Sequence, residues 1–328
     1  MAFIFDSGKP GPTVLFRTDI DALPIEEINT FGHKSQKEGV SHKCGHDGHM
    51  AIMSLLSRKI AARRPDKGKA VLLYQPAEET GEGAERVILD EQFNQIKPDM
   101  AFALHNLPGF NHHDIVMRRQ TFASASKGMI IKLKGVTSHA GEPENGKNPA
   151  RAIAEIIQGF LDLPKNKVFK DLTLVTLIHT KLGERAFGTS AGYGEVMATL
   201  RSFRNDDMDI LTEKAEEIAR SAASKDDIEC EISYTEEFPA TINNEECNKL
   251  IHESASGLGL NVVTTEQPFR WSEDFGQFTS RFQGALFGLG SGMDQPQLHN
   301  PDYDFPDKII DTGANVFFEI YKRLLTDK

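Results

Sequence analysis

The sequence is poor in cysteine and has no long apolar run. Its 328 residues include only Cys44, Cys230 and Cys247. This small, odd number argues against a disulfide framework and indicates a reducing compartment. No stretch approaches the ~20 apolar residues of a membrane helix. The short apolar start of the chain also lacks the basic residues of a signal peptide. We therefore expect a cytoplasmic protein with no membrane partner.

Positive charge is scarce as well. Lys and Arg total 37 against 48 Asp and Glu, a net charge of -11, and no basic run interrupts the sequence. Nucleic acid is therefore not an expected partner. The hydrophobic share of 39% and charged share of 26% are those of an ordinary globular protein. Because one core rarely organises more than about 250 to 300 residues, we expect two domains.

The first hundred residues alternate strand-like and helix-like segments, which is typical of a layered α/β domain. We predict strands at 13–16, 70–74 and 100–104 and helices at 50–62 and 84–93. The same pattern returns after Pro239, with helices at 245–256 and 312–325 and a strand at 285–288.

The segment between these parts has another pattern. It reads as a strand at 129–131, a helix at 153–161, strands at 174–178 and 196–200, a helix at 211–222 and a strand at 228–234. The order βαββαβ predicts a ferredoxin-like unit. Cys230 then becomes an inward strand residue rather than a functional one. We therefore predict a discontinuous domain, residues 1–117 and 237–328, that is interrupted by an insert at 118–236.

Cys44 and His46 stand two residues apart in a predicted loop. On extended backbone such residues point the same way, so both can bind one metal ion. Asp47 would cap the following helix. The alternatives are a polar loop with an exposed cysteine, or half of a zinc knuckle. No second cysteine pair follows at zinc-finger spacing.

Acidic or imidazole residues follow four of the predicted strands. They are Asp19, Asp21, Glu78, Glu79, His105 and His299. Each alone is compatible with an ordinary surface or core position. Together they indicate a site, because ligands of open α/β sheets bind beyond the carboxyl ends of the strands. Glu78 and Glu79 diverge on extended backbone, so we expect one to be a ligand and the other a base.

The glycine-rich segment 288–292 offers a different hypothesis, a nicotinamide-dependent oxidoreductase. Pro296 follows soon after it, and no long helix begins there. A dinucleotide-binding loop needs such a helix, so this hypothesis is not favoured.

Six motifs in this order resemble those of the hippurate hydrolase, auxin-conjugate hydrolase and N-acyl amino acid amidohydrolase family of two-metal peptidases. They are RTDIDALP at 17–24, CGHDGH at 44–49, QPAEE at 75–79, SHAG at 138–141, SEDF at 272–275 and HNP at 299–301. The resemblance runs from Phe16 to the C-terminus. It implies a metallopeptidase-type catalytic domain with a central mixed sheet, and an inserted ferredoxin-like dimerisation domain.

The resemblance also implies the roles of individual residues. Two divalent ions, Zn, Mn, Co or Ni, would be held by Cys44, His46, Glu79, His105 and His299, with Cys44 the best candidate for a bridging ligand. Glu78 would be the general base, and Asp19 would orient a ligand from behind. His139, in the insert, would reach the metal site of the partner in a homodimer. Family members generally carry a further helical segment before the strand at Thr13. This sequence departs from that pattern, because it starts almost at the strand.

These expectations define a reaction. Metal-activated water would cleave the amide bond of a small N-acylated amino acid or dipeptide, with Glu78 as proton shuttle and His139 at the developing oxyanion. Arg201, after the strand at 196–200, is either a partner for the substrate carboxylate or a surface arginine. The alternative is a non-catalytic metal-binding protein of this fold. The sequence defines neither the acyl group nor the native metal.

Overall fold

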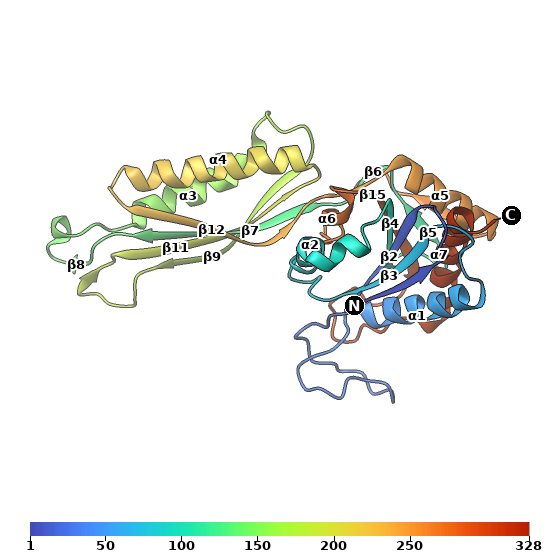
Figure 1. Ribbon diagram of the computed structural model, residues 1–328. Helices are drawn as coiled ribbons and strands as arrows, with labels where there is room; N and C mark the ends of the chain where they lie inside the picture. The colour runs from blue at the N-terminus through green and yellow to red at the C-terminus, as the bar shows by residue number, and fades with distance from the viewer. Residues whose placement is uncertain (328) are drawn as a thin grey trace. The chain divides into compact units, whose positions relative to one another are not determined.

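Two units make up the part of the chain that the computed structural model describes, residues 1–327 (Figure 1). The first, called the sheet unit here, comprises residues 1–122, 241–269 and 273–327. The second, the inserted unit, comprises Ala123–Ala240 and Arg270–Ser272. The sequence had suggested boundaries at 118 and 236. The helices within residues 1–327 are each too short or too polar to span a membrane.

The sheet unit is built on a seven-stranded mixed sheet of order β1-β3-β2-β4-β15-β5-β14. Its four central strands run parallel, namely β3 (Lys69–Gln75), β2 (Thr13–Asp19), β4 (Met100–Pro108) and β15 (Gln283–Gly292). β1 (Ala2–Asp6) lies antiparallel on β3, β5 (Ile115–Met117) antiparallel on β15, and β14 (Val262–Thr264) parallel to β5. The parallel strands therefore end at one common edge of the sheet.

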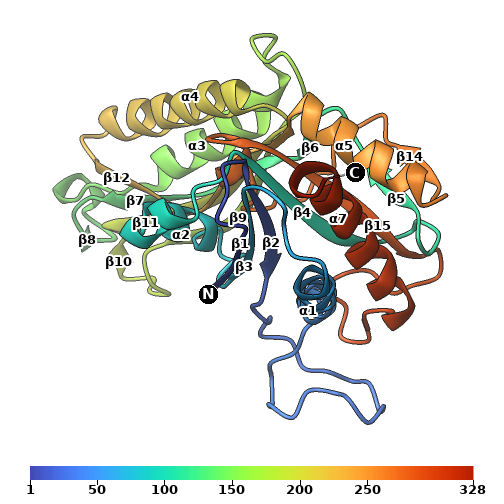
Figure 2. The same ribbon diagram turned by 45° about the vertical axis from the view of Figure 1, so that its right-hand side comes forward.

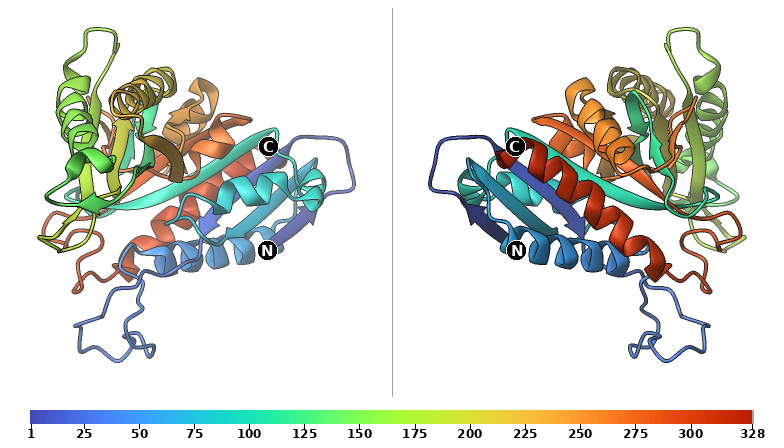
Figure 3. Two further views of the ribbon diagram at one scale, coloured as in Figure 1. Left: turned by 90° about the vertical axis from the view of Figure 1, so that its left-hand side faces the viewer. Right: turned by 90° about the vertical axis from the view of Figure 1, so that its right-hand side faces the viewer.

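Helices cover both faces of this sheet. α1 (His46–Ala62), α5 (Glu245–Gly257) and α7 (Ile310–Leu325) share one hydrophobic core with inward residues of β2 and β4. Figures 2 and 3 show α1 and α7 side by side on this face. The short helices α2 (Gly83–Leu89) and α6 (Gly276–Thr279) pack against each other; α2 contacts β3, and α6 contacts β15. Burial on both faces explains why the central strands are continuous apolar runs.

The inserted unit has a four-stranded antiparallel sheet of order β12-β7-β11-β9. In chain order its main elements are β7 (Ala125–Lys134), α3 (Ala150–Asp162), β9 (Thr173–Leu182), β11 (Tyr193–Ser202), α4 (Asn205–Ser224) and β12 (Glu229–Phe238). Both helices cover the same face of the sheet (Figure 1). The predicted βαββαβ order is thus confirmed, and with it the fold class. Cys230 is partly buried against this core.

The sequence missed several short elements and misjudged one helix. Beside β1, β5 and β14, the missed strands are β6 (Gln120–Ala123), β8 (Ser138–His139), β10 (Thr189–Ser190) and β13 (Thr241–Asn243). The helix predicted at 84–93 is wrong in its second half, because α2 ends at Leu89. Asp90 is extended there, and its side chain accepts a hydrogen bond from the Gln92 amide and starts a separate 3-10 turn.

Candidate metal and active site

Metal-ligating side chains converge beyond the common edge of the parallel strands. The donor atoms of Cys44, His46 and His105 lie within 4.8 Å of one another, and so do those of Cys44, Glu79 and His299. Cys44 belongs to both groups. The five side chains that the sequence singled out as ligands are therefore brought together, in two sets of three that share one sulfur.

The loop before α1 creates the first part of this arrangement. Gly45 has a φ of 95°, a left-handed conformation that favours glycine, and a side chain there would meet Asn106 at 2.8 Å. α1 begins directly afterwards at His46. Cys44 and His46 therefore converge across a glycine turn and a helix start, not along an extended strand. The prediction that Asp47 caps this helix is wrong, because the residue before the first turn is Gly45.

His46 is oriented so that one ring nitrogen faces the cluster. Its Nδ1 donates to the main-chain carbonyl of Asp21 at 3.1 Å. Its Nε2 is buried without a hydrogen-bond partner, 3.8 Å from Glu79 Oε1. Glu79 Oε1 is buried and unpartnered too, and lies 3.6 Å from His299 Nε2. Buried polar atoms left in this way are costly, and a divalent cation among them would satisfy both.

The pKa values indicate the same need for a cation. Burial raises the pKa of the Cys44 thiol, and the nearby carboxylates of Glu79 and Glu78 raise it further. Burial also raises the pKa of Glu79 to about 7 and lowers that of His105 to about 3. These raised pKa values disfavour the anionic forms of the Cys44 thiol and the Glu79 carboxyl. A divalent cation would reverse that effect for the thiol and the carboxylates, while His105 already favours the neutral form that ligates metals.

Glu78 and Glu79 are held by different partners although they are adjacent. The Glu79 amide donates to Asp21 Oδ2 at 3.0 Å. Glu78 Oε1 accepts the amide of Asp274 at 3.3 Å, which leaves its Oε2 3.9 Å from His46 Nε2. Ala77, just before them, has a φ of 59°, which is unusual for a residue with a side chain. This backbone turn sends both carboxylates to the cluster from separate anchors.

Asp19 lies behind the cluster in a chain of buried polar contacts. Its Oδ1 is 2.6 Å from His49 Nδ1, and its Oδ2 is 3.7 Å from His46 Nε2. The other ring nitrogen of His49 is 2.5 Å from Asn106 Oδ1, and the Asn106 amide group donates to the Tyr303 hydroxyl. The sequence analysis missed His49 and Asn106. His49 follows His46 by about one helical turn, a spacing that signals a shared face; Asn106 has no such signal.

His139 and Arg201 belong to the inserted unit, whereas the metal-ligating residues belong to the sheet unit. His139 is exposed on β8, which pairs with β10, and its Nδ1 accepts the Gly141 amide at 3.1 Å. Arg201 is half-buried on β11, where it donates to the Arg270 carbonyl at 2.8 Å and to Ser272 Oγ at 2.9 Å. Both therefore have local contacts within the inserted unit.

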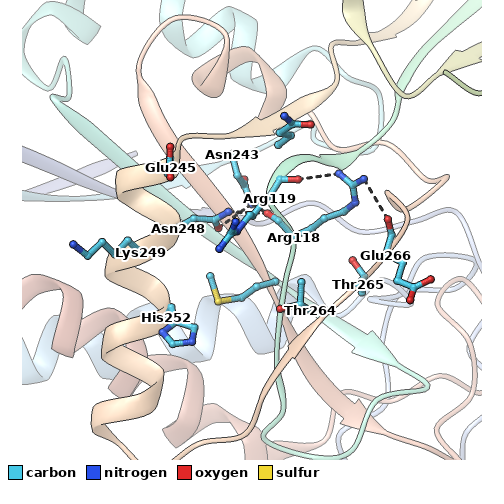
Figure 4. A pocket seen from close by; sticks show the side chains of 12 residues that line it. Arg118, Arg119, Asn243, Glu245, Asn248, Lys249, His252, Thr264, Thr265 and Glu266 are labelled. Carbon is cyan, nitrogen blue, oxygen red and sulfur yellow. Dashed lines mark hydrogen bonds between the residues drawn. The ribbon is translucent and has the colours of Figure 1, made fainter. Parts of the chain in front are cut away.

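A cavity of about 900 Å³ in the sheet unit is separate from the cluster (Figure 4). α5 lines it with Lys249 and His252, and the segment after β14 with Glu266. Met117 on β5 also lines the cavity, two strands away from β4 in the sheet, and none of the five metal-ligating residues is in its lining. The cavity is not the place of the chemistry described above.

Comparison with known proteins places the chain in a family. The pattern of "Peptidase family M20/M25/M40" matches residues 15–323, nearly the whole chain. The chain belongs to this family. An uncharacterized hydrolase of Staphylococcus haemolyticus (strain JCSC1435) is 28% identical over 331 residues, which cover 97% of this chain and 85% of that relative. The protein is therefore a hydrolase of the M20 peptidase family.

Solved structures share the family M20 fold. A dinuclear metal binding peptidase of this family from Bacillus subtilis superposes with a TM-score of 0.83 at 22% identity, over 99% of this chain and 84% of that one. The aminobenzoyl-glutamate utilization protein from Klebsiella pneumoniae superposes with a TM-score of 0.73 at 19% identity, over 97% of this chain and 73% of that protein's chain.

The glycine-rich segment has a structural explanation in this fold. It forms the end of β15, where a side chain at Gly290 would meet the Asn111 carbonyl at 2.0 Å and one at Gly288 would meet Leu107 at 2.1 Å. These glycines allow close packing. They form no dinucleotide-binding loop, so the oxidoreductase hypothesis is dropped.

The different anchoring of Glu78 and Glu79 predicts different effects of their amide variants. Glu79→Gln is expected to lower bound metal, because an unpartnered ligand oxygen is lost. Glu78→Gln is expected to retain metal while losing most turnover. Elemental analysis after gel filtration measures the metal content, with the exposed Glu82→Gln as control. If Glu78→Gln emptied the site and Glu79→Gln did not, the two roles would have to be exchanged.

Proposed function

We propose that this protein hydrolyses the amide bond of a small N-acylated amino acid or dipeptide with two divalent ions per chain. The observation that carries the proposal is the shared sulfur: Cys44 belongs to both groups of three donors. The names of two structural relatives agree with it. One is a dinuclear metal binding peptidase, and the other serves the utilization of aminobenzoyl-glutamate. We expect the protein to act in the cytoplasm.

The donor set defines which ions fit. We assign Cys44, His46, Glu79, His105 and His299 as the ligands. A thiolate with imidazoles and a carboxylate suits borderline ions such as Zn, Mn, Co or Ni, and is poorly matched to Mg. Such ions would supply Lewis acidity and a water nucleophile at neutral pH. Asp19 would not bind metal itself but would orient a ligand, since it contacts His49 and lies near His46.

Glu78 is the proposed general base. One of its oxygens is fixed by the Asp274 amide, so the other is free to face the reacting water. It is 5% exposed, which keeps bulk solvent from competing for the proton. Glu78 takes a proton from the attacking water and then delivers it to the departing amine nitrogen.

We further propose that His139 acts in a homodimer, on the cluster of the partner chain. β9 is an edge strand of the inserted sheet, and its Ile178 and Leu182 are 61% and 44% exposed. An exposed apolar edge of this kind is suited to pairing with a second copy across a two-fold axis. His139 would then stabilise the developing oxyanion. Arg201 donates hydrogen bonds to a carbonyl and a hydroxyl, and it stays our candidate for the substrate carboxylate.

Metal removal tests the activity. Protein dialysed against a chelator is expected to lose hydrolysis of N-acetyl, N-benzoyl or dipeptide substrates and to regain it with Zn, Mn, Co or Ni, but little with Mg, because the donor set suits borderline ions. Release of free amino acid is the measurement. Full activity of the metal-free protein would contradict the mechanism. Metal binding without turnover across the panel would instead favour the non-catalytic metal-binding protein.

Mixing two inactive variants tests the shared site. Glu78→Ala and His139→Ala chains are each expected to be inactive. In a mixed dimer, one site combines an intact Glu78 with the partner's intact His139. An equal mixture should therefore regain roughly a quarter of wild-type activity if subunits exchange freely. Subunit exchange is followed by fluorescence transfer between labelled chains. Confirmed exchange with no recovered activity would refute the contribution in trans.

A further inference from the structure

We infer that Arg17 is a positioning residue for Glu78 and acts on it through Asp274. The inference rests on the proposed function, because it takes Glu78 as the base. Arg17 lies on β2 and is 2% exposed. It is distant in sequence from both residues, and no role was expected for it from the sequence.

Arg17, Gln75 and Asp274 form a closed ring of hydrogen bonds. Arg17 Nε donates to Gln75 Oε1 at 3.0 Å, and Arg17 Nη2 to Asp274 Oδ1 at 2.5 Å. Gln75 Nε2 donates to Asp274 Oδ2 at 2.7 Å, which closes the ring. All three side chains are buried. Each member therefore restricts the rotamers of the other two, and both oxygens of the Asp274 carboxylate are held within the ring.

Asp274 holds the Glu78 segment from two directions. Its main-chain amide donates to Glu78 Oε1 at 3.3 Å. Its Oδ2 accepts the Ala84 amide at 2.8 Å, at the end of the turn that carries Glu78. Within this turn the Gly83 amide donates to the carbonyl of Ala77, the residue with left-handed φ. A strained turn of this kind persists only where its surroundings determine it, and Asp274 supplies two of the bonds.

The geometry of the guanidinium explains why arginine suits this position. Beside the ring, Arg17 Nη1 donates to Asp19 Oδ2 at 2.7 Å, and Nη2 lies 3.0 Å from Glu273 Oε1. One planar group thus serves four acceptors in different directions. Lysine carries the same charge on a single nitrogen and cannot span them. Arg17→Lys therefore separates the charge of the residue from its geometry.

Arg17 also touches the ligand side of the site, which offers a competing explanation. Asp19, its fourth partner, contacts His49 and lies near His46. If Arg17 acted mainly through Asp19, its replacement would disturb the metal ligands. Metal content therefore distinguishes the path through Asp274 from the path through Asp19.

Amide hydrogen exchange tests the positioning without any activity assay. In metal-loaded Arg17→Lys, exchange at Asp274 and Ala84 is expected to accelerate about tenfold or more, because their acceptors are no longer fixed. The matched control is Arg281→Lys, an exposed arginine that bonds Gln277. Gln75→Leu opens the same ring without changing charge and is expected to act in the same direction, which covers the case that Arg17→Lys does not fold. Unchanged exchange in the folded variants overturns the inference.

Kinetics test whether the effect reaches the base. With metal content retained, Arg17→Lys is expected to lower kcat roughly 10- to 100-fold at nearly unchanged KM, as for a misplaced catalytic group. In a Glu78→Gln background the same change should lower the residual rate less than about twofold, because the two residues act as one unit. Equal losses in both backgrounds, or loss of metal, overturn the inference. A wild-type protein that cleaves nothing refutes the proposed function instead, and amide exchange then decides the positioning alone.

Discussion

At the carboxyl edge of the central sheet, buried acidic groups outnumber buried permanent cations. Asp19, Glu78, Glu273 and Asp274 are at most 5% exposed, and Cys44 lies beside them. Arg17 is the one arginine in contact with this group among the described residues, and it pairs with three of the carboxylates. Isolated buried charges are too costly to persist, so the acidic groups that Arg17 does not pair with, Glu78 and Cys44, must be protonated or matched by other cations. Divalent ions held by Cys44, His46, Glu79, His105 and His299 would supply the missing positive charge without further side chains.

This electrostatic constraint connects the fold to the chemistry. Parallel strands deliver Asp19, Gln75 and His105 to one edge, and two left-handed turns at Gly45 and Ala77 aim the neighbouring side chains at a common point. Arg17 then divides the site. On one side Asp19 contacts His49 and lies near His46, and on the other Asp274 contacts Glu78. Arg17 therefore contacts both halves of the site: through Asp19 it reaches the side proposed to bind metal, and through Asp274 it reaches the proposed base Glu78.

The parts of this architecture that sequence could reveal are those with a local signal. Central strands such as β2 are continuous apolar runs because both faces are buried, and the strands of the insert alternate. Strands such as β1 and β14 have few residues and are defined by pairing with a neighbour, so they escaped prediction. Asn106 contacts His49 and Tyr303, which are distant from it in sequence, so no local pattern indicates these contacts. The positive φ of Ala77 has no local sequence signal either.

The central claim is that one sulfur serves two ions, and X-ray absorption at the zinc edge tests it directly. The chain supplies a single cysteine to this site, so a bridging Cys44 gives each of two zinc ions a sulfur neighbour at ~2.3 Å. The account predicts about one sulfur per zinc in protein loaded with two equivalents, and none in Cys44→Ser. About half a sulfur per zinc would mean that Cys44 binds one ion only, and no sulfur signal at all would contradict the site as assigned.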